Sequence, residues 1–189
     1  MKVLGLIGEN GAGKGTMVEI LKEMFGIDSV ASFTYSSFLT HMLEYFGLPM
    51  SRANLQALAE FLRALDPEIL GKKAEIEIRK LLEQKQLFSE LRFIVVDGIR
   101  KEAEIKPIKK FNGAIIYITA KPEIRYERLK RRAEKKGETH MDFEQFLKEE
   151  VARADIDIPA IGAKADFIIE NNGDIEDLRK KINEFVSSL

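Results

Sequence analysis

The 189-residue chain contains no cysteine and no tryptophan, and it has only two histidines. Without cysteine it can form no disulfide, use no thiolate nucleophile and build no cysteine-based zinc site. An excess of either charge is also missing, because 30 Lys and Arg residues almost balance 31 Asp and Glu residues. A net charge of -1 gives no overall attraction to nucleic acid or to an anionic membrane, and we expect neither as a partner.

Long hydrophobic runs are absent as well, and no stretch approaches the roughly 18 apolar residues that a membrane span needs. The apolar run that opens the sequence ends at Ile7 and gives way to glycines, which is too short for a secretory signal. The composition, 45% apolar and 32% charged, is that of a globular protein. We therefore expect a single cytoplasmic domain over residues 1–189, as a monomer or a homodimer.

Five short β-rich segments alternate with helical patterns along the chain. Several are continuously apolar, as parallel strands covered by helices on both faces are, and the intervening segments are long enough for right-handed crossovers. Strands are expected at Val3–Ile7, Ser29–Phe33, Phe93–Val96, Ala114–Ile118 and Phe167–Ile169. Helices are expected at Lys14–Phe25 (closed by Gly26), 101–110, 122–136, 142–154 and 174–186. The pattern predicts a doubly wound α/β fold with a five-stranded parallel sheet.

The largest insertion, residues 35–86, follows the second predicted strand. It contains three or four helical patterns, with breaks at Gly47-Leu48-Pro49 and at Asp66-Pro67. Ser51 and Asp66 are the N-caps that we expect for two of these helices. Ligands of doubly wound sheets bind beyond the carboxyl ends of the strands.

The strongest motif is the segment Gly8-Glu9-Asn10-Gly11-Ala12-Gly13-Lys14-Gly15-Thr16. It follows a buried-looking strand and opens an amphipathic helix, which is the context in which such a motif binds phosphate. The glycines let successive N–H groups point into one concavity at the positive end of the helix. Lys14 then places a cation against the β- and γ-phosphates of ATP. A plain glycine-rich turn is the alternative interpretation.

A carboxylate, Asp97, ends the apolar run Val95-Val96 and is followed by Gly98-Ile99-Arg100. In a phosphate-loop fold, an Asp beside the loop orients Mg²⁺ or its waters. Arg100 has a planar fork that suits an acceptor phosphate. We therefore expect Asp97 to hold magnesium through water and Arg100 to bind the substrate. An ordinary Asp-Gly turn after a strand is the alternative.

The Gly-Lys-Gly-Thr ending of the loop resembles the adenylate-kinase-like nucleoside monophosphate kinases. That resemblance implies a P-loop sheet of strand order 2-3-1-4-5, a Mg²⁺ held mainly by phosphates and water, and Thr16 near the α-phosphate or the metal. The segment from Asp97 to Arg100 is one residue shorter than the Asp-Gly-Phe-Pro-Arg of these kinases. It is more similar to dephospho-coenzyme A kinases and phage-type deoxynucleotide kinases, and most similar to adenylate-kinase-related proteins of archaea and bacteria. This last likeness covers nearly the whole chain, including residues 54–56, 62–63, 124–129 and 165–169.

Four arginines follow the fourth predicted strand: Arg125, Arg128, Arg131 and Arg132. One interpretation is a solvated surface in which Glu123, Glu127 and Glu134 pair with them. The other is a lid over residues 131–155, hinged at Lys136-Gly137-Glu138, that closes over the triphosphate. In the resembling kinases lid arginines have this role, and Arg128, Arg132 and Arg153 match it.

The insertion after the second strand lies where the resembling kinases bind their acceptor. Its polar groups that could meet a phosphorylated substrate are Ser36, Ser37, Arg52, Asn54, Gln56 and Arg63. We take Ser37, Arg52 and Arg63, with Arg100, as the substrate-binding candidates. Either Arg52 or Arg63 could instead form an ion pair with Glu60 or Asp66.

The segment Glu170-Asn171-Asn172-Gly173-Asp174 follows the last predicted strand. The resembling kinases hold the adenine ring in an Asn-x-Gly loop at this point, which implies Asn171 and Gly173 at the donor base. A turn followed by a helix that Asp174 caps is the alternative, and both can hold together.

These residues predict an ATP- and Mg²⁺-dependent phosphotransferase whose acceptor is a small phosphorylated molecule, a nucleoside or deoxynucleoside monophosphate. The catalytic candidates are Lys14, Asp97, Arg128, Arg132 and Arg153. A dephospho-coenzyme A kinase is one alternative. The other is an ATPase without an acceptor that acts as a regulatory or binding module.

Overall fold

A five-stranded parallel sheet forms the centre of the computed structural model, which describes residues 1–84, 90–136, 141–151 and 157–189. The strands are β1 (Lys2–Ile7), β2 (Val30–Thr34), β3 (Phe93–Ile99), β4 (Ala114–Thr119) and β5 (Phe167–Glu170). Their order is β2-β3-β1-β4-β5, and every neighbouring pair is parallel. The predicted fold class and strand order are confirmed, and β1, which carries the phosphate loop, occupies the middle of the sheet.

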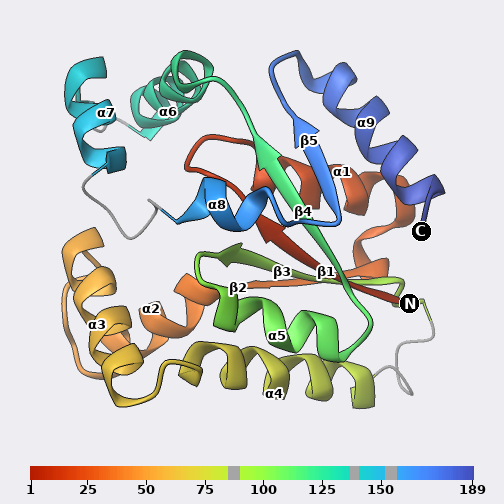
Figure 1. Cartoon of the computed structure of the whole chain (residues 1–189), viewed down its shortest axis with the longest axis horizontal. Helices are drawn as coiled ribbons and strands as arrows, with labels where there is room; N and C mark the ends of the chain where they lie inside the picture. Colours follow the sequence, from red (N-terminus) through yellow and green to blue (C-terminus); the bar gives the residue numbers. More distant parts are fainter. Residues whose placement is uncertain (85–89, 137–140, 152–156) are drawn as a thin grey trace.

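Helices connect the strands and cover both faces of the sheet (Figure 1). The helices are α1 (Lys14–Phe25), α2 (Tyr35–Tyr45), α3 (Arg52–Leu65), α4 (Ile69–Gln84), α5 (Glu102–Lys110), α6 (Pro122–Lys136), α7 (Phe143–Val151), α8 (Ile158–Gly162) and α9 (Ile175–Ser187). A short 3-10 turn, Ile27–Ser29, joins α1 to β2. Within the described residues no helix is both long and apolar enough to cross a membrane.

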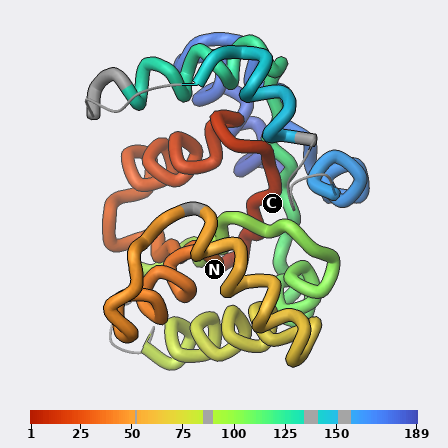
Figure 2. Tube along the Cα trace, turned by 90° about the vertical axis from the view of Figure 1, so that its left-hand side faces the viewer, coloured from red at the N-terminus to blue at the C-terminus, as the bar shows by residue number. Residues whose placement is uncertain are grey.

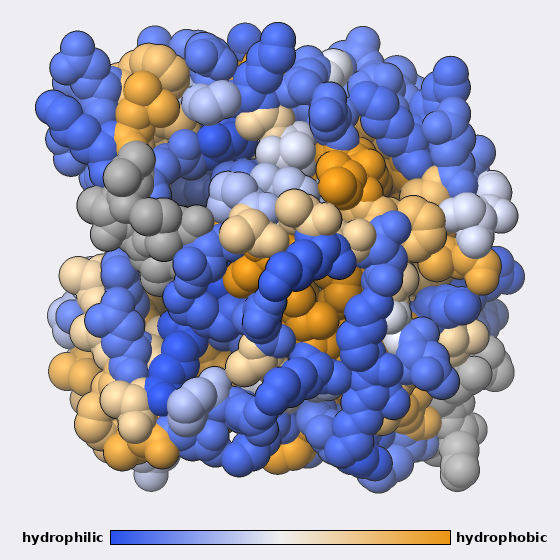
Figure 3. Space-filling model, in the orientation of Figure 1, coloured by the Kyte–Doolittle hydropathy of each residue, from blue (hydrophilic) through white to orange (hydrophobic). Residues whose placement is uncertain are grey.

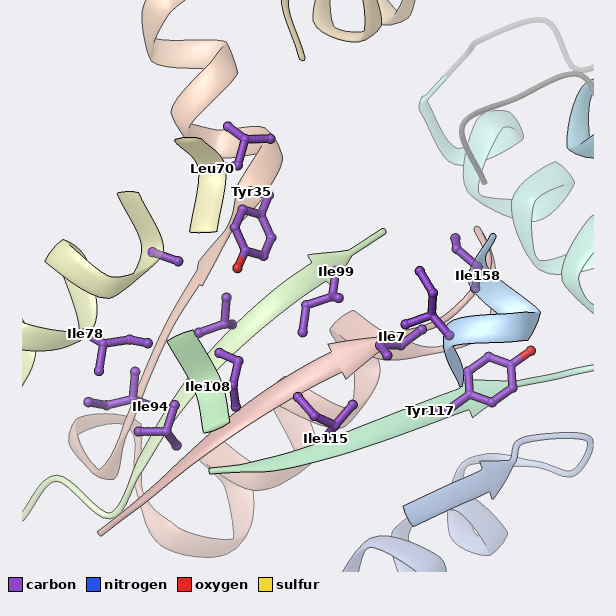
Figure 4. Packing of buried hydrophobic residues seen from close by; sticks show 14 of the residues in the cluster. Ile7, Tyr35, Leu70, Ile78, Ile94, Ile99, Ile108, Ile115, Tyr117 and Ile158 are labelled. Carbon is purple, nitrogen blue, oxygen red and sulfur yellow. The ribbon is translucent and has the colours of Figure 1, made fainter. Parts of the chain in front are cut away.

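Two apolar layers fill the space on either side of the sheet. On one face, α1 and α9 pack on strand side chains that include Leu4, Val95 and Ile116. On the other face, α4, α5 and α8 cover a second set. Figure 4 shows part of this second set, in which Ile94 and Ile115 of the strands face Ile108 of α5. Burial of β1, β3 and β4 on both faces explains their largely apolar sequences.

Several helix ends follow from single residues. Gly26 ends α1 with a φ of 95°, a backbone conformation that suits glycine. The Ser51 hydroxyl accepts the N–H of Asn54 at 3.1 Å, so Ser51 is the N-cap of α3, as expected. The prediction for Asp66 was wrong. Helix α4 begins only at Ile69, and the Asp66 carboxylate accepts the N–H of Glu68 in the preceding turn.

Other differences from the sequence prediction include the end of β3 and the helix α8. Strand β3 continues to Ile99, three residues beyond the predicted end, so that Asp97 lies inside the strand. Helix α7 ends at Val151, and the predicted continuation to residue 154 falls outside the described residues. The five-residue helix α8 was not predicted, because its apolar pattern covers little more than one turn.

The carboxyl ends of the strands point toward two groups of helices, α2 with α3 and α6 with α7 (Figure 1). Figure 2 views this end directly and shows the first turn of α1 between the two groups. A binding site beyond the strand ends is the general rule for this kind of sheet.

The face drawn in Figure 3 is largely hydrophilic, but apolar surface gathers at its lower left, over α3. On α3, Phe61 and Leu65 are exposed, as are Tyr45 and Phe46 at the end of α2.

Leucine-to-alanine substitutions should separate core from surface. Leu4 is completely buried, whereas Leu65 is 66% exposed. We expect Leu4→Ala to lower the free energy of unfolding by about 2–5 kcal/mol, since it removes packed methyl groups and leaves a cavity. Leu65→Ala should change it by less than about 0.5 kcal/mol. Equilibrium urea unfolding of both variants measures this difference. A loss below about 1 kcal/mol for Leu4→Ala would contradict the assigned core.

Candidate active site

The phosphate loop leaves the end of β1 and turns directly into α1. Gly11 and Gly13 have φ angles of 81° and 111°, which few residues other than glycine adopt. Gly13 has no side chain to cap α1, and the first turn of α1 contains no acidic residue. The N–H groups at this helix end are therefore available for an anion, at the positive end of the helix dipole.

Lys14 bends back over the loop that precedes it. Its ammonium group donates to the carbonyl of Gly8 at 2.7 Å and to that of Glu9 at 3.2 Å. The Glu9 carboxylate in turn accepts a hydrogen bond from the Tyr117 hydroxyl of β4. These contacts hold the cation at the mouth of the loop, where a bound phosphate would meet it.

Asn171, in the loop after β5, supports the phosphate loop from the outside. It is only 3% exposed, and its side-chain N–H donates to the carbonyl of Ala12 at 2.8 Å. A Cβ atom on Gly13 would lie 2.3 Å from this amide nitrogen, so the close approach requires glycine. The side chain of Asn171 thus positions the loop.

Arg125 supports the loop from the side of α6. It is 4% exposed, and its guanidinium pairs with both carboxylate oxygens of Glu150 on α7. One of its N–H groups also lies 3.5 Å from the carbonyl of Asn10, and its own carbonyl would be 2.8 Å from a Cβ on Gly11. Arg125 therefore joins α7 to the phosphate loop. It is buried, so it does not belong to the solvated surface of paired arginines and glutamates that was one interpretation of the sequence.

Arg128 lies one helical turn further along α6 and faces the loop after β5. It donates to the carbonyl of Gly173 at 3.1 Å and to the side-chain oxygen of Asn171 at 3.3 Å. Its second terminal nitrogen is buried and has no hydrogen-bond partner among the described residues. Burial lowers the pKa of this guanidinium, which nevertheless stays charged at neutral pH. A partly buried cation with one buried, unused N–H group is suited to an anionic ligand.

A cavity of about 830 Å³ unites these features, and we call it the large cavity. Its volume lies within the range of small-molecule binding sites. Its polar lining is Asn10, Gly11, Gly13, Lys14, Gly15, Thr16, Ser36, Asp97, Arg128, Arg131, Arg132, Asn171, Gly173 and Asp174. The predicted residues of the phosphate loop, the end of β3, α6 and the loop after β5 therefore meet at one place.

Asp97 reaches the large cavity from a bulge in β3. Leu6 of β1 pairs with Asp97 but the next residue pairs with Ile99, and Gly98 between them has a φ of 86°. One oxygen of the Asp97 carboxylate is buried and has no partner among the described residues. Burial raises the pKa of Asp97, and the charges of Lys14 and Arg100 and the N–H of Gly98 only partly oppose it.

These features fit a magnesium ion bound through water. Asp97 offers an unpartnered carboxylate oxygen in the large cavity, which the hydroxyl-bearing Thr16 also lines. No group of three or more acidic or histidine side chains suited to a metal occurs in the described part of the chain. Such a site is typical of Mg²⁺ that keeps most of its waters and also binds substrate phosphates.

A second cavity of about 150 Å³, which we call the small cavity, adjoins the large one. Ser36 lines both, and the neighbouring residues Asp97 and Gly98 line one each. Tyr35, Leu39, Leu55, Gln56, Ala59, Arg63, Leu70 and Arg100 complete the small cavity. Arg63 and Arg100, two of the predicted substrate ligands, thus come together although they are 37 positions apart in the sequence.

Of the other predicted site residues, Ser37 lines neither of these cavities. Ser37 donates its hydroxyl to the carbonyl of Thr34 at 2.6 Å and lines a separate apolar cavity of about 790 Å³ between α2 and α4. Arg52 begins α3, and only its backbone is described. Arg153 and the predicted hinge at 137–138 lie outside the described residues. The lid therefore stays a prediction.

The fold and the phosphate loop define a P-loop protein of the kinase-like, nucleotide-binding class. Residues 4–152 match a family model described as an AAA domain, and the chain belongs to this family. A UPF0200 protein of Sulfurisphaera tokodaii is 28% identical over 190 residues, which cover all of this chain and 98% of that protein. A UPF0200/UPF0201 protein of Archaeoglobus fulgidus is also 28% identical, but the chain spans only 56% of its length.

Solved structures with the same fold include two shikimate kinases. The enzyme from Acinetobacter baumannii, in complex with shikimate, has a TM-score of 0.56 and 19% identity over all of this chain and 94% of its own. The enzyme from Aquifex aeolicus has a TM-score of 0.57 and 16% identity over 98% of this chain and 96% of its own. The protein TT1252 from Thermus thermophilus has a TM-score of 0.57 and 19% identity, over all of this chain and 97% of its own. At these identities the likeness establishes the fold alone.

Replacement of Asp97 should stabilise the ligand-free protein at neutral pH. Because burial raises the folded-state pKa of Asp97, its contribution to stability is present below the unfolded pKa of about 3.9 and is lost as pH rises through the higher folded value. Asp97→Asn removes a buried charge without changing the shape. We expect the melting temperature of this variant to exceed that of the wild type at pH 7, by a margin that shrinks toward pH 3.

Asp166→Asn is the control with the opposite sign. Burial raises the pKa of Asp166, but hydrogen bonds from Lys109 and from the N–H of Ile115 outweigh it and lower the pKa. This carboxylate therefore stabilises the fold above its unfolded pKa and loses that effect as pH falls. Asp166→Asn should lower the melting temperature at pH 7. Differential scanning fluorimetry from pH 3 to pH 8 measures the melting temperatures of both variants. If Asp97→Asn melts below the wild type at pH 7, the raised pKa assigned to the buried Asp97 carboxylate is wrong.

Proposed function

We propose that the protein transfers the γ-phosphoryl group of ATP to a small phosphorylated acceptor, a nucleoside or deoxynucleoside monophosphate. The observation that carries this proposal is the contact between the two cavities at Ser36, Asp97 and Gly98. One cavity contains the phosphate loop, and the other contains two arginines. A donor in the first and an acceptor phosphate in the second would meet where these residues lie.

The residues of the large cavity suit a nucleoside triphosphate. The N–H groups of the loop and the ammonium of Lys14 would bind the β- and γ-phosphates. Arg128 has a buried terminal nitrogen without a hydrogen-bond partner among the described residues, and Arg128 and Arg132 both line this cavity. Asn171 and Gly173 also line this cavity, and we propose that the donor base binds beside them.

The small cavity suits the phosphorylated end of the acceptor. Arg63 and Arg100 provide cationic forks, and Leu39, Leu55 and Leu70 provide an apolar wall. Its volume is below the roughly 300 Å³ of typical whole-ligand sites, so the rest of the acceptor would extend toward the opening. Two arginines at this point favour an acceptor that already carries a phosphate over a neutral alcohol.

In the proposed reaction an oxygen of the acceptor phosphate attacks the γ-phosphorus of ATP, and the bond to the β–γ bridging oxygen breaks to release ADP. The nucleophile is already an anion, so no side chain has to remove a proton. Lys14 stabilises the charge on the transferred group, and the two arginines fix the attacking oxygen. A magnesium ion held through Asp97 would neutralise charge on the β- and γ-phosphates.

A second candidate is transfer to a hydroxyl, as in dephospho-coenzyme A. The raised pKa of Asp97 favours it, because a carboxylate with that property accepts a proton more readily. In that reaction Asp97 would take the hydroxyl proton as the attack proceeds.

A coupled ADP-release assay tests both candidates. ATP and Mg²⁺ are supplied with each ribo- and deoxynucleoside monophosphate in turn, and with dephospho-coenzyme A. Stimulation by a monophosphate supports the first proposal, and stimulation by dephospho-coenzyme A alone supports the second. A basal rate that no acceptor changes would point to an ATPase without an acceptor and overturn both.

Lys14→Ala should lower kcat with the best acceptor by roughly 10²–10³-fold, since it removes a cation from the transferred group. Lys22→Ala is a matched control, because Lys22 lies on the same helix but pairs with Glu19 on the surface. We expect the control to retain wild-type kcat. Turnover by Lys14→Ala within threefold of the wild type would rule out the proposed role of the loop.

A further inference from the structure

One buried carboxylate, that of Glu104 on α5, accepts hydrogen bonds from both arginines of the small cavity. Glu104 is only 2% exposed, and both of its oxygens are occupied. One oxygen accepts a hydrogen bond from the guanidinium of Arg63 at 2.7 Å. The other accepts the backbone N–H of Arg100 at 2.8 Å and that of Lys101 at 3.3 Å. A buried carboxylate with three donors is well satisfied, so this arrangement is rigid.

The contact with Arg63 goes beyond the ordinary capping of a helix. A glutamate in the first turn commonly accepts N–H groups at the start of its own helix, as Glu104 does with Lys101. Arg63, however, comes from α3, 41 positions earlier in the chain. Glu104 thereby ties the helical insertion to the end of β3, which are the two walls of the small cavity.

The ion pair leaves most of the Arg63 guanidinium available. Of the five N–H donors of an arginine, a single terminal nitrogen contacts Glu104, and the described residues offer Arg63 no other partner. The remaining donors lie at the small cavity, which Arg63 lines. A carboxylate behind a guanidinium fixes its plane, so that its other edge is presented to a ligand.

Tyr35, the first residue of α2, also forms a hydrogen bond with Glu104. Its hydroxyl donates to the backbone carbonyl of Glu104 at 2.9 Å. Burial, together with the nearby Glu104 charge, raises the pKa of Tyr35, so the hydroxyl remains protonated and keeps donating. Side chains of α2 and α3 thus converge on one residue of α5.

We propose that Glu104 is the positioning residue for the acceptor phosphate, which it serves by holding the Arg63 guanidinium and the Arg100 backbone together at the small cavity. This inference rests on the proposed function, since it assigns the small cavity to a phosphate. Glu104 itself would not touch the phosphate. It acts through Arg63 and Arg100, so its loss should weaken acceptor binding and leave ATP binding unchanged.

Glu104→Gln is the decisive variant. Glutamine accepts the same backbone N–H groups and keeps the helix cap, but it removes the charge that orients Arg63. We expect the acceptor KM to rise about 10- to 100-fold, with the ATP KM within twofold of the wild type. Glu102→Gln is the matched control on the same helix, because Glu102 pairs on the surface with Lys164. Its acceptor KM should not change.

A purely structural role for Glu104 would give a different result. Equal increases in the KM of acceptor and ATP, or a folded Glu104→Gln protein with a wild-type acceptor KM, would overturn the inference. If Glu104→Gln fails to fold, Glu104→Asp replaces it, since this variant keeps the charge but cannot reach Arg63 and both N–H groups at once. A folded Glu104→Asp protein should raise the acceptor KM at least threefold, and an unchanged value would refute the proposal.

Calorimetry separates this inference from the proposed reaction. The large cavity is first saturated with Mg-ADP, and inorganic phosphate is then titrated into the wild type and into Glu104→Gln. We expect phosphate to bind the wild type at least tenfold more tightly. If no acceptor supports turnover but this difference is found, the proposed reaction fails and the positioning role stands. Absence of phosphate binding by the wild type, or equal affinity in the two proteins, would overturn the positioning role.

Discussion

The N–H groups at the start of α1 have to stay free for an anion, and much of the surrounding structure follows from that requirement. A loop that leaves its own N–H groups unused loses the hydrogen bonds that would normally hold it. Its support therefore comes through carbonyl groups and from neighbouring elements. Asn171 donates to Ala12, Lys14 donates to Gly8, and the backbone of Arg125 packs against Gly11. The outer side of the loop is satisfied while the inner side remains open.

The same requirement accounts for the buried polar atoms without a partner around the large cavity. One Asp97 oxygen and one Arg128 nitrogen are buried without a hydrogen-bond partner in the described chain. Buried polar atoms of this kind cost stability and are uncommon outside functional sites. Their signs match a ligand of mixed charge, with anionic phosphates toward the arginine and a cation toward the carboxylate. The site is thus arranged for a ligand at the expense of the ligand-free protein.

Local patterns predicted the fold and the half of the site that contiguous residues form. The loop from Gly8 to Thr16 and the apolar strands need only neighbours in sequence to be recognised, and the strand order follows from that class of loop. The sequence did not predict the roles of Glu104 and Glu150, because each pairs with an arginine that is distant in the sequence. Glu104 pairs with Arg63, 41 positions away, and Glu150 pairs with Arg125, 25 positions away. Nothing in the sequence around Glu104 distinguishes a buried ion pair from an ordinary helix cap. The Asp66 cap failed for a local reason, since a turn of two residues intervenes before α4.

The two cavities differ in what holds them in place, and this difference bears on their roles. The large cavity is built at the ends of β1 and β3, whose positions are fixed by backbone pairing on both sides. The small cavity depends on side chains of α2 and α3 that reach α5 through one ion pair and one hydroxyl. Backbone pairing tolerates changes of side chain, whereas a buried ion pair does not. In the proposed reaction, donor binding would therefore depend on the fold, and the choice of acceptor would depend on a few side chains in the helical insertion.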